Sequence, residues 1–99
     1  MPKTTLIVHA TPCPHGAEAL AQYSAQAGAI LKAHNGKLLN KYKVTDILTK
    51  GTVTQVVMLM EFEDDTIIDA LSNGEAYQAL IPLRDKAFSH ISIVFTETV

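Results

Sequence analysis

The spacing of apolar residues along the chain predicts four β-strands. Residues 4–10 are rich in β-forming residues, with Leu6, Val8 and Ala10 on one side and Ile7 and His9 on the other, as in a strand. Ile91, Ile93 and Phe95 occupy alternate positions over residues 90–97, which predicts the last strand. Residues 37–48 alternate less regularly, as expected of a strand with a wet stretch or an edge position. An unbroken apolar run within residues 53–62 predicts a strand that is buried on both faces.

Between these strands the apolar period changes to that of a helix. Apolar residues recur every three or four positions over residues 16–34, and Asn35-Gly36 follows as a pair that commonly ends a helix. A short helix is expected over residues 66–71 and a second helical stretch over residues 75–88. Pro82 lacks an amide hydrogen, so it should kink that stretch or divide it into two short helices.

The resulting order, βαββαβ, predicts an α+β ferredoxin-like fold: one four-stranded antiparallel sheet with both helices on one face. Apolar residues occupy both odd and even positions along the strands, which point to opposite faces of the sheet, so they cannot all face the helices. The pattern does not decide which set of positions faces them. The uncovered face should therefore carry an apolar patch of the kind that marks an interface. We expect a second copy to bury this patch sheet to sheet, forming a symmetric homodimer through the open sheet face. The residues that lead to this expectation are Leu6, Val8, Val57, Leu59, Ile91 and Ile93.

Length and charge narrow the class of protein. A chain of 99 residues fits a single domain over residues 1–99, and 47% hydrophobic residues make it globular rather than disordered. A net charge of −2, with no basic cluster larger than the Lys41–Lys43 pair, argues against nucleic-acid binding. We expect no membrane association and a cytoplasmic location, because the sequence shows no secretory signal, no spanning apolar run and only one cysteine.

Four histidines and Cys13 are the first candidates for chemistry. Their spacing matches no metal-ligand motif, so we expect neither a metal nor a cofactor. Cys13 and His15 precede a predicted helix N-terminus, but no third group is identified that would orient a thiol nucleophile. His9 is the candidate catalytic base, since imidazole exchanges protons near neutral pH; the alternative is a structural, hydrogen-bonded histidine. We expect the first and last strands, which carry His9 and His90, to pair only through their neighbours.

Two tyrosines and an arginine form the second candidate group. Tyr23 and Tyr77 lie on or near the apolar stripes of predicted helices, either as core aromatics with satisfied hydroxyls or as the lining of a pocket. Arg84 can hold a carboxylate with two parallel hydrogen bonds, or can pair with a local carboxylate such as Asp85 or Glu61. These three residues are the candidate substrate-binding set.

Several segments resemble those of a known family. They are Asn35-Gly36-Lys37-Leu38-Leu39, Ile47-Leu48-Thr49-Lys50-Gly51, Glu61-Phe62, and Glu75-Ala76-Tyr77-Gln78-Ala79-Leu80 followed by Leu83-Arg84. Together they make nearly the whole chain similar to the DUF1330 family of the dimeric α+β-barrel superfamily. The resemblance implies the ferredoxin-like fold and the dimer, and in this fold a ligand cavity lies between sheet and helices. It implies no established reaction.

Two functions remain open at this point. In the first, the dimer binds a small apolar or aromatic acid in a pocket between sheet and helices, either as a binding protein or as a cofactor-independent enzyme. His9 would then move a proton while Tyr23 and Arg84 orient the substrate. In the second, the protein is a non-catalytic structural or stress-related dimer with a packed core. The sequence does not decide whether the protein is an enzyme.

Overall fold

The computed structural model describes residues 3–51 and 53–99 of the chain. Over this part the elements are, in order, β1 (Thr4–Pro12), α1 (Ala17–Ala33), β2 (Lys37–Lys43), β3 (Val56–Phe62), α2 (Thr66–Ser72), α3 (Glu75–Gln78), α4 (Ile81–Ala87) and β4 (Phe88–Thr96). The second helical stretch is divided as predicted, because Pro82 stands in the first turn of a new helix, where its missing amide hydrogen costs no hydrogen bond.

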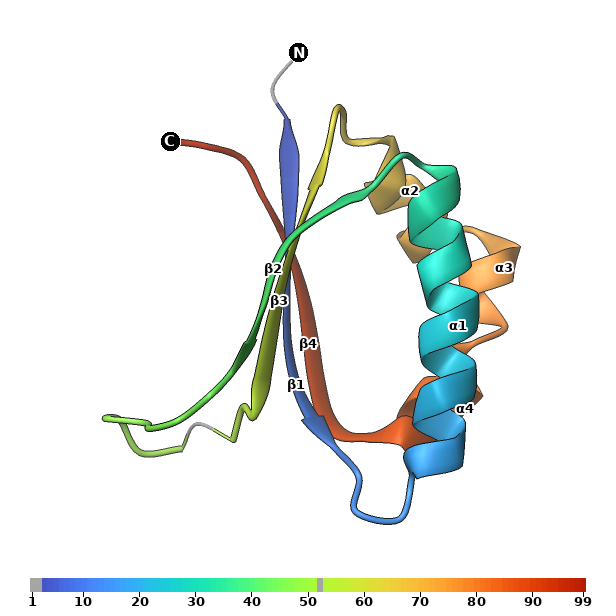
Figure 1. The fold of residues 1–99 in the computed structure, drawn as a ribbon. Coiled ribbons are helices and arrows are strands. Elements are labelled where there is room, and N and C mark those ends of the chain that lie inside the picture. Colours follow the sequence, from blue (N-terminus) through green and yellow to red (C-terminus); the bar gives the residue numbers. More distant parts are fainter. Residues whose placement is uncertain (1–2, 52) are drawn as a thin grey trace.

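The four strands form one antiparallel sheet in the order β2-β3-β1-β4, and the helices lie on one face of it (Figure 1). This confirms the α+β ferredoxin-like fold. One expected detail is wrong: β1 pairs directly with β4, because the strand order places β1 between β3 and β4. The two central strands are therefore β1 and β3, and the edges are β2 and β4.

The burial of alternate side chains along β1 shows which side of the sheet faces the helices, a point that the sequence left open. Leu6 and Ala10 are buried and Val8 packs against the core, so the even-numbered side chains of β1 face the helices. The strand register extends this assignment to the other strands. The opposite surface, called the open face below, carries Thr5, Ile7, His9 and Thr11 of β1, Val57, Leu59 and Glu61 of β3, His90, Ser92, Val94 and Thr96 of β4, and Lys37, Asn40 and Tyr42 of β2.

The turn between α1 and β2 shows why Asn35-Gly36 ends the helix. Asn35 adopts a positive φ of 62°, a conformation that asparagine tolerates better than most residues. A Cβ on Gly36 would stand 2.6 Å from Cε1 of Phe62, which is one of the most deeply buried side chains. Only glycine allows the chain to pass this close to the core at the end of β3.

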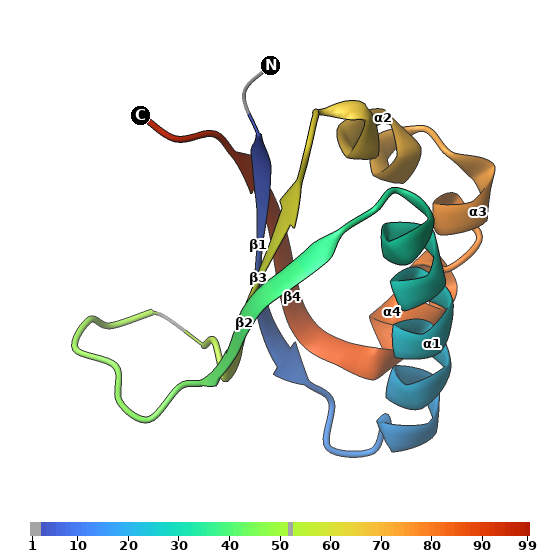
Figure 2. The same ribbon diagram turned by 45° about the horizontal axis from the view of Figure 1, so that its top comes forward.

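Two strand boundaries differ from those predicted. The strand predicted over residues 37–48 ends at Lys43, and the strand predicted over residues 53–62 begins at Val56. The intervening residues 44–51 and 53–55, called the β2–β3 loop below, belong to a segment that extends beyond the sheet on the side opposite the helices (Figure 2). Periodicity failed here because the loop keeps apolar residues, including Ile47, Leu48 and Val53, that resemble those of a strand.

The first and last strands of the chain, β1 and β4, are longer than predicted. β1 continues through Thr11 to Pro12, where the pairing with β4 shifts register, so the proline falls at an irregular strand end and not within the ladder. Within the described residues, no helix is long and apolar enough to cross a membrane.

We predict that Ile67→Ala lowers the free energy of unfolding by about 2–5 kcal/mol, because Ile67 is 0% exposed and its truncation leaves a cavity. The measurement is urea unfolding followed by circular dichroism. Ile68→Ala, the same change at the half-buried next position of α2, is the matched control and should cost clearly less. Equal losses for the two variants would contradict the placement of α2.

Candidate functional site

The structure brings the three predicted binding residues together. Tyr23 of α1 and Tyr77 of α3 are both buried, and their hydroxyl oxygens lie 2.7 Å apart in a hydrogen bond. Nη1 of Arg84, on α4, donates to the Tyr77 hydroxyl at 3.2 Å, and its guanidinium carbon lies 5.9 Å from the centroid of the Tyr77 ring. We call these three residues the Tyr–Tyr–Arg cluster.

The local fold explains why residues so far apart in the sequence meet here. The amide of Leu80 donates to the carbonyl of Tyr77, and the amide of Arg84 donates to the carbonyl of Leu80, both at 2.8 Å. These two bonds turn the chain from α3 into α4 and bring Arg84 back against Tyr77. The Tyr23 ring meets Phe88 at the start of β4 edge to face, with 5.6 Å between centroids.

Burial controls the electrostatics of the cluster. It is the main cause that raises the pKa of the Tyr23 hydroxyl far above its ordinary value, and the hydrogen bond with Tyr77 adds to it. Tyr23 therefore acts as a neutral hydrogen-bonding group and not as an acid or base near neutral pH.

Arg84 retains hydrogen-bonding capacity that the cluster does not use. Its Nε is buried and has no hydrogen-bond partner among the described residues, although the whole side chain is 24% exposed. The expected local pairing exists only weakly, since Oδ1 of Asp85 lies 3.9 Å from Nε, beyond hydrogen-bond distance. The other expected partner, Glu61, pairs with Lys3 instead. A guanidinium with an unpaired Nε–H can donate hydrogen bonds to a planar anion such as a carboxylate.

His9 does not share this site. We expected it to move a proton on a molecule held by Tyr23 and Arg84, but His9 lies on the open face and those residues lie on the helix side of the sheet. The reason is the two-residue period of β1: Val8 faces the helices, so its neighbour faces away. Within one protomer the sheet therefore separates the imidazole from the Tyr–Tyr–Arg cluster.

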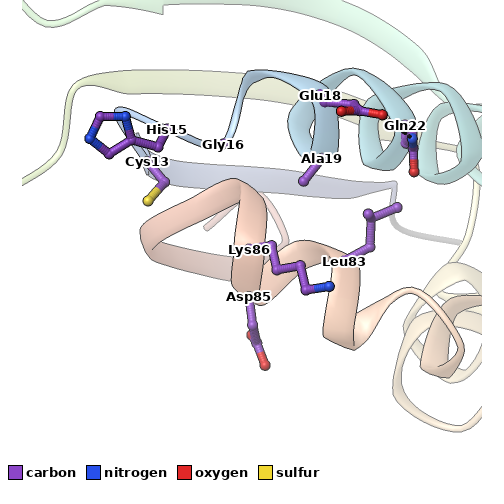
Figure 3. Close-up of a pocket in the computed structure, with 9 residues that line it drawn as sticks. All are labelled: Cys13, His15, Gly16, Glu18, Ala19, Gln22, Leu83, Asp85 and Lys86. Atoms are coloured by element: carbon purple, nitrogen blue, oxygen red, sulfur yellow. Dashed lines mark hydrogen bonds between the residues drawn. The ribbon is translucent and has the colours of Figure 1, made fainter.

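Cys13 and His15 lie at one end of a surface groove of about 540 Å³ between the start of α1 and α4 (Figure 3). Ala19 and Leu83 are its apolar lining residues, while Glu18, Gln22, Asp85 and Lys86 also border it. The imidazole ring and the sulfur point in different directions in Figure 3, so they do not form the hydrogen-bonded pair of an activated thiol. The groove is open and lies outside the sheet–helix layer.

A second, smaller hollow of about 280 Å³ lies along β2, where it is lined by Lys41, Tyr42, Lys43 and Val56. Sequence patterning did not indicate it, because it depends on the pairing of β2 with the start of β3. Among residues 3–51 and 53–99, no group of three His, Cys, Asp or Glu side chains lies close enough to hold a metal ion.

The sheet order and the one-sided helical layer define a protein of the ferredoxin-like α+β class. The model of the DUF1330 family, described as a domain of unknown function, matches residues 6–99. The chain therefore belongs to the DUF1330 family, as the resemblance of its segments indicated. No functionally curated protein matches the sequence.

Solved structures agree on the fold. The RPA0582 protein of Rhodopseudomonas palustris, of unknown function, aligns with a TM-score of 0.76 and 15% identity over 99% of this chain and 83% of that one. A dimeric ferredoxin-like protein of unknown function from Jannaschia sp. CCS1 aligns with a TM-score of 0.66 and 17% identity, over 97% and 99% of the two chains. A dimeric protein of ferredoxin-like fold from Bacteroides fragilis gives 0.60 and 9%, over 97% and 96%. At these identities the likeness shows the fold alone.

We predict that the free energy of unfolding falls as the pH rises above about 10. The contribution of Tyr23 to this loss is about 1 kcal/mol between pH 10 and pH 11. The pKa of Tyr23 is raised in the folded state, so its contribution is complete below the unfolded value and is lost at higher pH, where the unfolded chain ionises first. Urea unfolding at both pH values measures the loss. Tyr23→Phe should remove this part of it, and an unchanged loss in that variant would contradict the assignment.

Proposed function

We propose that the protein is a homodimeric binding protein for a small apolar or aromatic carboxylic acid, held on the helix side of the sheet at the Tyr–Tyr–Arg cluster. Arg84 would bind the carboxylate, and Tyr77 with Tyr23 would fix the orientation of the guanidinium. No reaction is included in the proposal, since the only predicted proton-transfer residue, His9, lies on the other face.

One observation carries the ligand class: a buried Nε of Arg84 without a hydrogen-bond partner. Buried polar groups in folded proteins are nearly always satisfied, so this donor is one that a bound group can satisfy. The group in question is a permanent cation with a planar array of donors, and a carboxylate is its geometric complement. The apolar side chains packed on this side of the sheet, among them Val8, Met58 and Ile93, suit an apolar or aromatic body.

The open face supports the homodimer. Ile7, Val57 and Leu59 are only half-buried although they lie on the two central strands, and the edge residues Val94 and Tyr42 are 42% and 48% exposed. A sheet with one uncovered apolar face is stabilised when a second sheet packs on it at about 10 Å. Because a twofold axis presents the same patch on both copies, the face needs only to be complementary to itself.

The β2–β3 loop adds to this argument. It projects past the open face and exposes Leu48 almost fully, at 99%, together with Ile47 and Val53 (Figure 1). A second copy seated on the open face would lie beside this loop, which would then cover apolar side chains that are solvated in the single chain. A cytoplasmic location is also part of the proposal, supported by the single free thiol of Cys13.

The alternative is a non-catalytic dimeric structural or stress-related module with a packed core. Two observations favour it: the hydroxyls of Tyr23 and Tyr77 satisfy each other, and both hollows described above are open grooves that do not include the cluster. In this alternative, Nε of Arg84 is satisfied by water and the cluster serves stability alone. The two proposals differ in whether an aromatic acid binds.

We predict that benzoate binds saturably in isothermal titration calorimetry and that benzamide, its neutral counterpart, does not. Arg84→Gln should weaken benzoate binding about 10–100-fold, because a charge-assisted hydrogen bond is worth roughly 1.5–3 kcal/mol. The matched control is Lys86→Gln, which removes a positive charge from the exposed side of the same helix and should leave binding unchanged. If benzoate, phenylacetate and hexanoate all fail to bind, the packed-core module is the better account.

We predict that Val57→Glu converts the dimer to a folded monomer, since the new carboxylates would be buried against the partner sheet without a counter-charge. Sedimentation equilibrium measures the association and circular dichroism the fold. Ala25→Glu places the same charge on the exposed side of α1 and should leave the dimer intact. A Val57→Glu protein that remains dimeric would exclude the open face as the interface.

A further inference from the structure

We infer that the homodimer is a proton-sensitive assembly: His9 of each copy lies in the sheet–sheet interface as a neutral imidazole, and its protonation drives the two copies apart. This inference rests on the proposed homodimer and adds a regulation of that same interface. It gives His9 a function that does not depend on the Tyr–Tyr–Arg cluster, which lies on the opposite face of the sheet.

The position of His9 is set by the sheet. It lies on β1, one of the two central strands, and is already half-buried in the single chain. On the open face its direct cross-strand neighbours are Val57 of β3 and Ser92 of β4, with Ile7 two residues along its own strand. A second sheet packed on the central strands would cover these side chains, so His9 cannot stay in bulk water in the dimer.

The strands of the open face offer a protonated His9 no free carboxylate. Their titratable or charged groups are Lys37 and Tyr42 of β2, Glu61 of β3 and His90 of β4. Glu61 is the only acid on these strands and lies four residues beyond Val57 on β3, which is roughly 13 Å along a strand. The β2–β3 loop beside this face adds Asp46 and Lys50, and Oδ1 of Asp46 already accepts a hydrogen bond from the amide of Ile47. His90 pairs with Thr11, two residues from His9, and would add positive charge on protonation.

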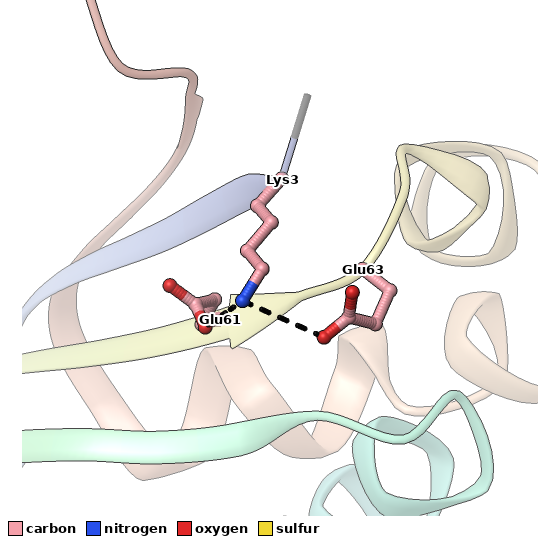
Figure 4. Close-up of polar contacts among 3 residues, drawn as sticks. All are labelled: Lys3, Glu61 and Glu63. Atoms are coloured by element: carbon pink, nitrogen blue, oxygen red, sulfur yellow. Dashed lines mark hydrogen bonds and ion pairs between the residues drawn. The ribbon is translucent and has the colours of Figure 1, made fainter. Parts of the chain in front are cut away.

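Glu61 is also engaged elsewhere. Its Oε1 accepts a hydrogen bond from Nζ of Lys3 at 3.3 Å, and the same ammonium lies 3.7 Å from Oε1 of Glu63 (Figure 4). This hydrogen bond, followed by the charges of Glu61 and Glu63, raises the pKa of Lys3 above its ordinary value, as expected when a cation is held by two acids. The nearest acid of the face is thus already paired with a cation.

Symmetry doubles the effect of the proton. A twofold axis brings two copies of His9 into one interface, so each dimer buries two imidazoles. A buried imidazolium without a counter-charge is costly, whereas a neutral imidazole needs only hydrogen bonds. The dimer therefore binds fewer protons than two monomers, and mass action favours monomers as the pH falls.

The test is the dimer dissociation constant of the wild-type protein at pH 8.0 and pH 5.5, measured by sedimentation velocity over a concentration series. Each of the two interface imidazoles that must lose a proton weakens association by roughly a factor of ten at the lower pH, so the dissociation constant should rise about 100-fold. His9→Gln and His9→Leu should form dimers whose dissociation constants change little between the two pH values. Two variants are needed because glutamine keeps hydrogen bonding whereas leucine keeps only the bulk.

The matched control is His34→Gln, at the end of α1, which should retain the full pH dependence of the wild type. His90→Gln, on the exposed edge strand of the same face, should retain most of it, because β4 lies at the margin of the proposed interface. A dissociation constant that stays constant with pH, or a full pH effect in both His9 variants, would overturn the inference while leaving the dimer in place. A wild-type protein that is monomeric at pH 8.0 would instead overturn the proposed homodimer, and the inference with it. Circular dichroism at both pH values confirms that the chain remains folded.

Discussion

The structure depends on one constraint: its two central strands, β1 and β3, carry apolar side chains on both sides, while helices cover only one. On the covered side, Leu6 and Phe62 are each only 2% exposed and pack in the core with residues of α1 and α2. Ile7, Val57 and Leu59 leave the other side partly solvated. A second layer on the open face would complete the burial that a chain of 99 residues cannot achieve with its own helices.

The same constraint separates the chemistry of the protein into two places. The Tyr–Tyr–Arg cluster belongs to the helix side, where burial keeps Tyr23 neutral and leaves Nε of Arg84 without a partner. His9 belongs to the open face, among residues that a partner would cover. A ligand bound at Arg84 and a proton taken up by His9 would therefore act on opposite faces of one sheet, with β1 as the element that they share.

Much of the fold could be predicted from the sequence because the patterns were long and consistent. The apolar stripe over residues 16–34 predicted both ends of α1 to within one residue. Asn35-Gly36 was correctly predicted to end the helix, and the close approach of Gly36 to the Phe62 ring explains why a glycine stands there. The β2–β3 loop could not be predicted, because its exposed Ile47, Leu48 and Val53 have strand-like composition without a partner strand. The sequence indicated Tyr23, Tyr77 and Arg84 as one candidate binding set, but not the contacts among them, since those follow from the turn between α3 and α4. The side of the sheet on which His9 lies could not be predicted either. Apolar residues occur on both sides of β1, so the sequence does not show which side faces the helices.

Native mass spectrometry of freshly purified wild-type protein tests the central claim most directly, because it reports the number of chains and any bound mass together. The account predicts a dimer at twice the chain mass of 10.7 kDa when sprayed from a solution at pH 8. A further mass of small-acid size on each chain would support the ligand site as well. A bare monomer at micromolar concentration would contradict the account, because the open face would then have no second copy to cover it.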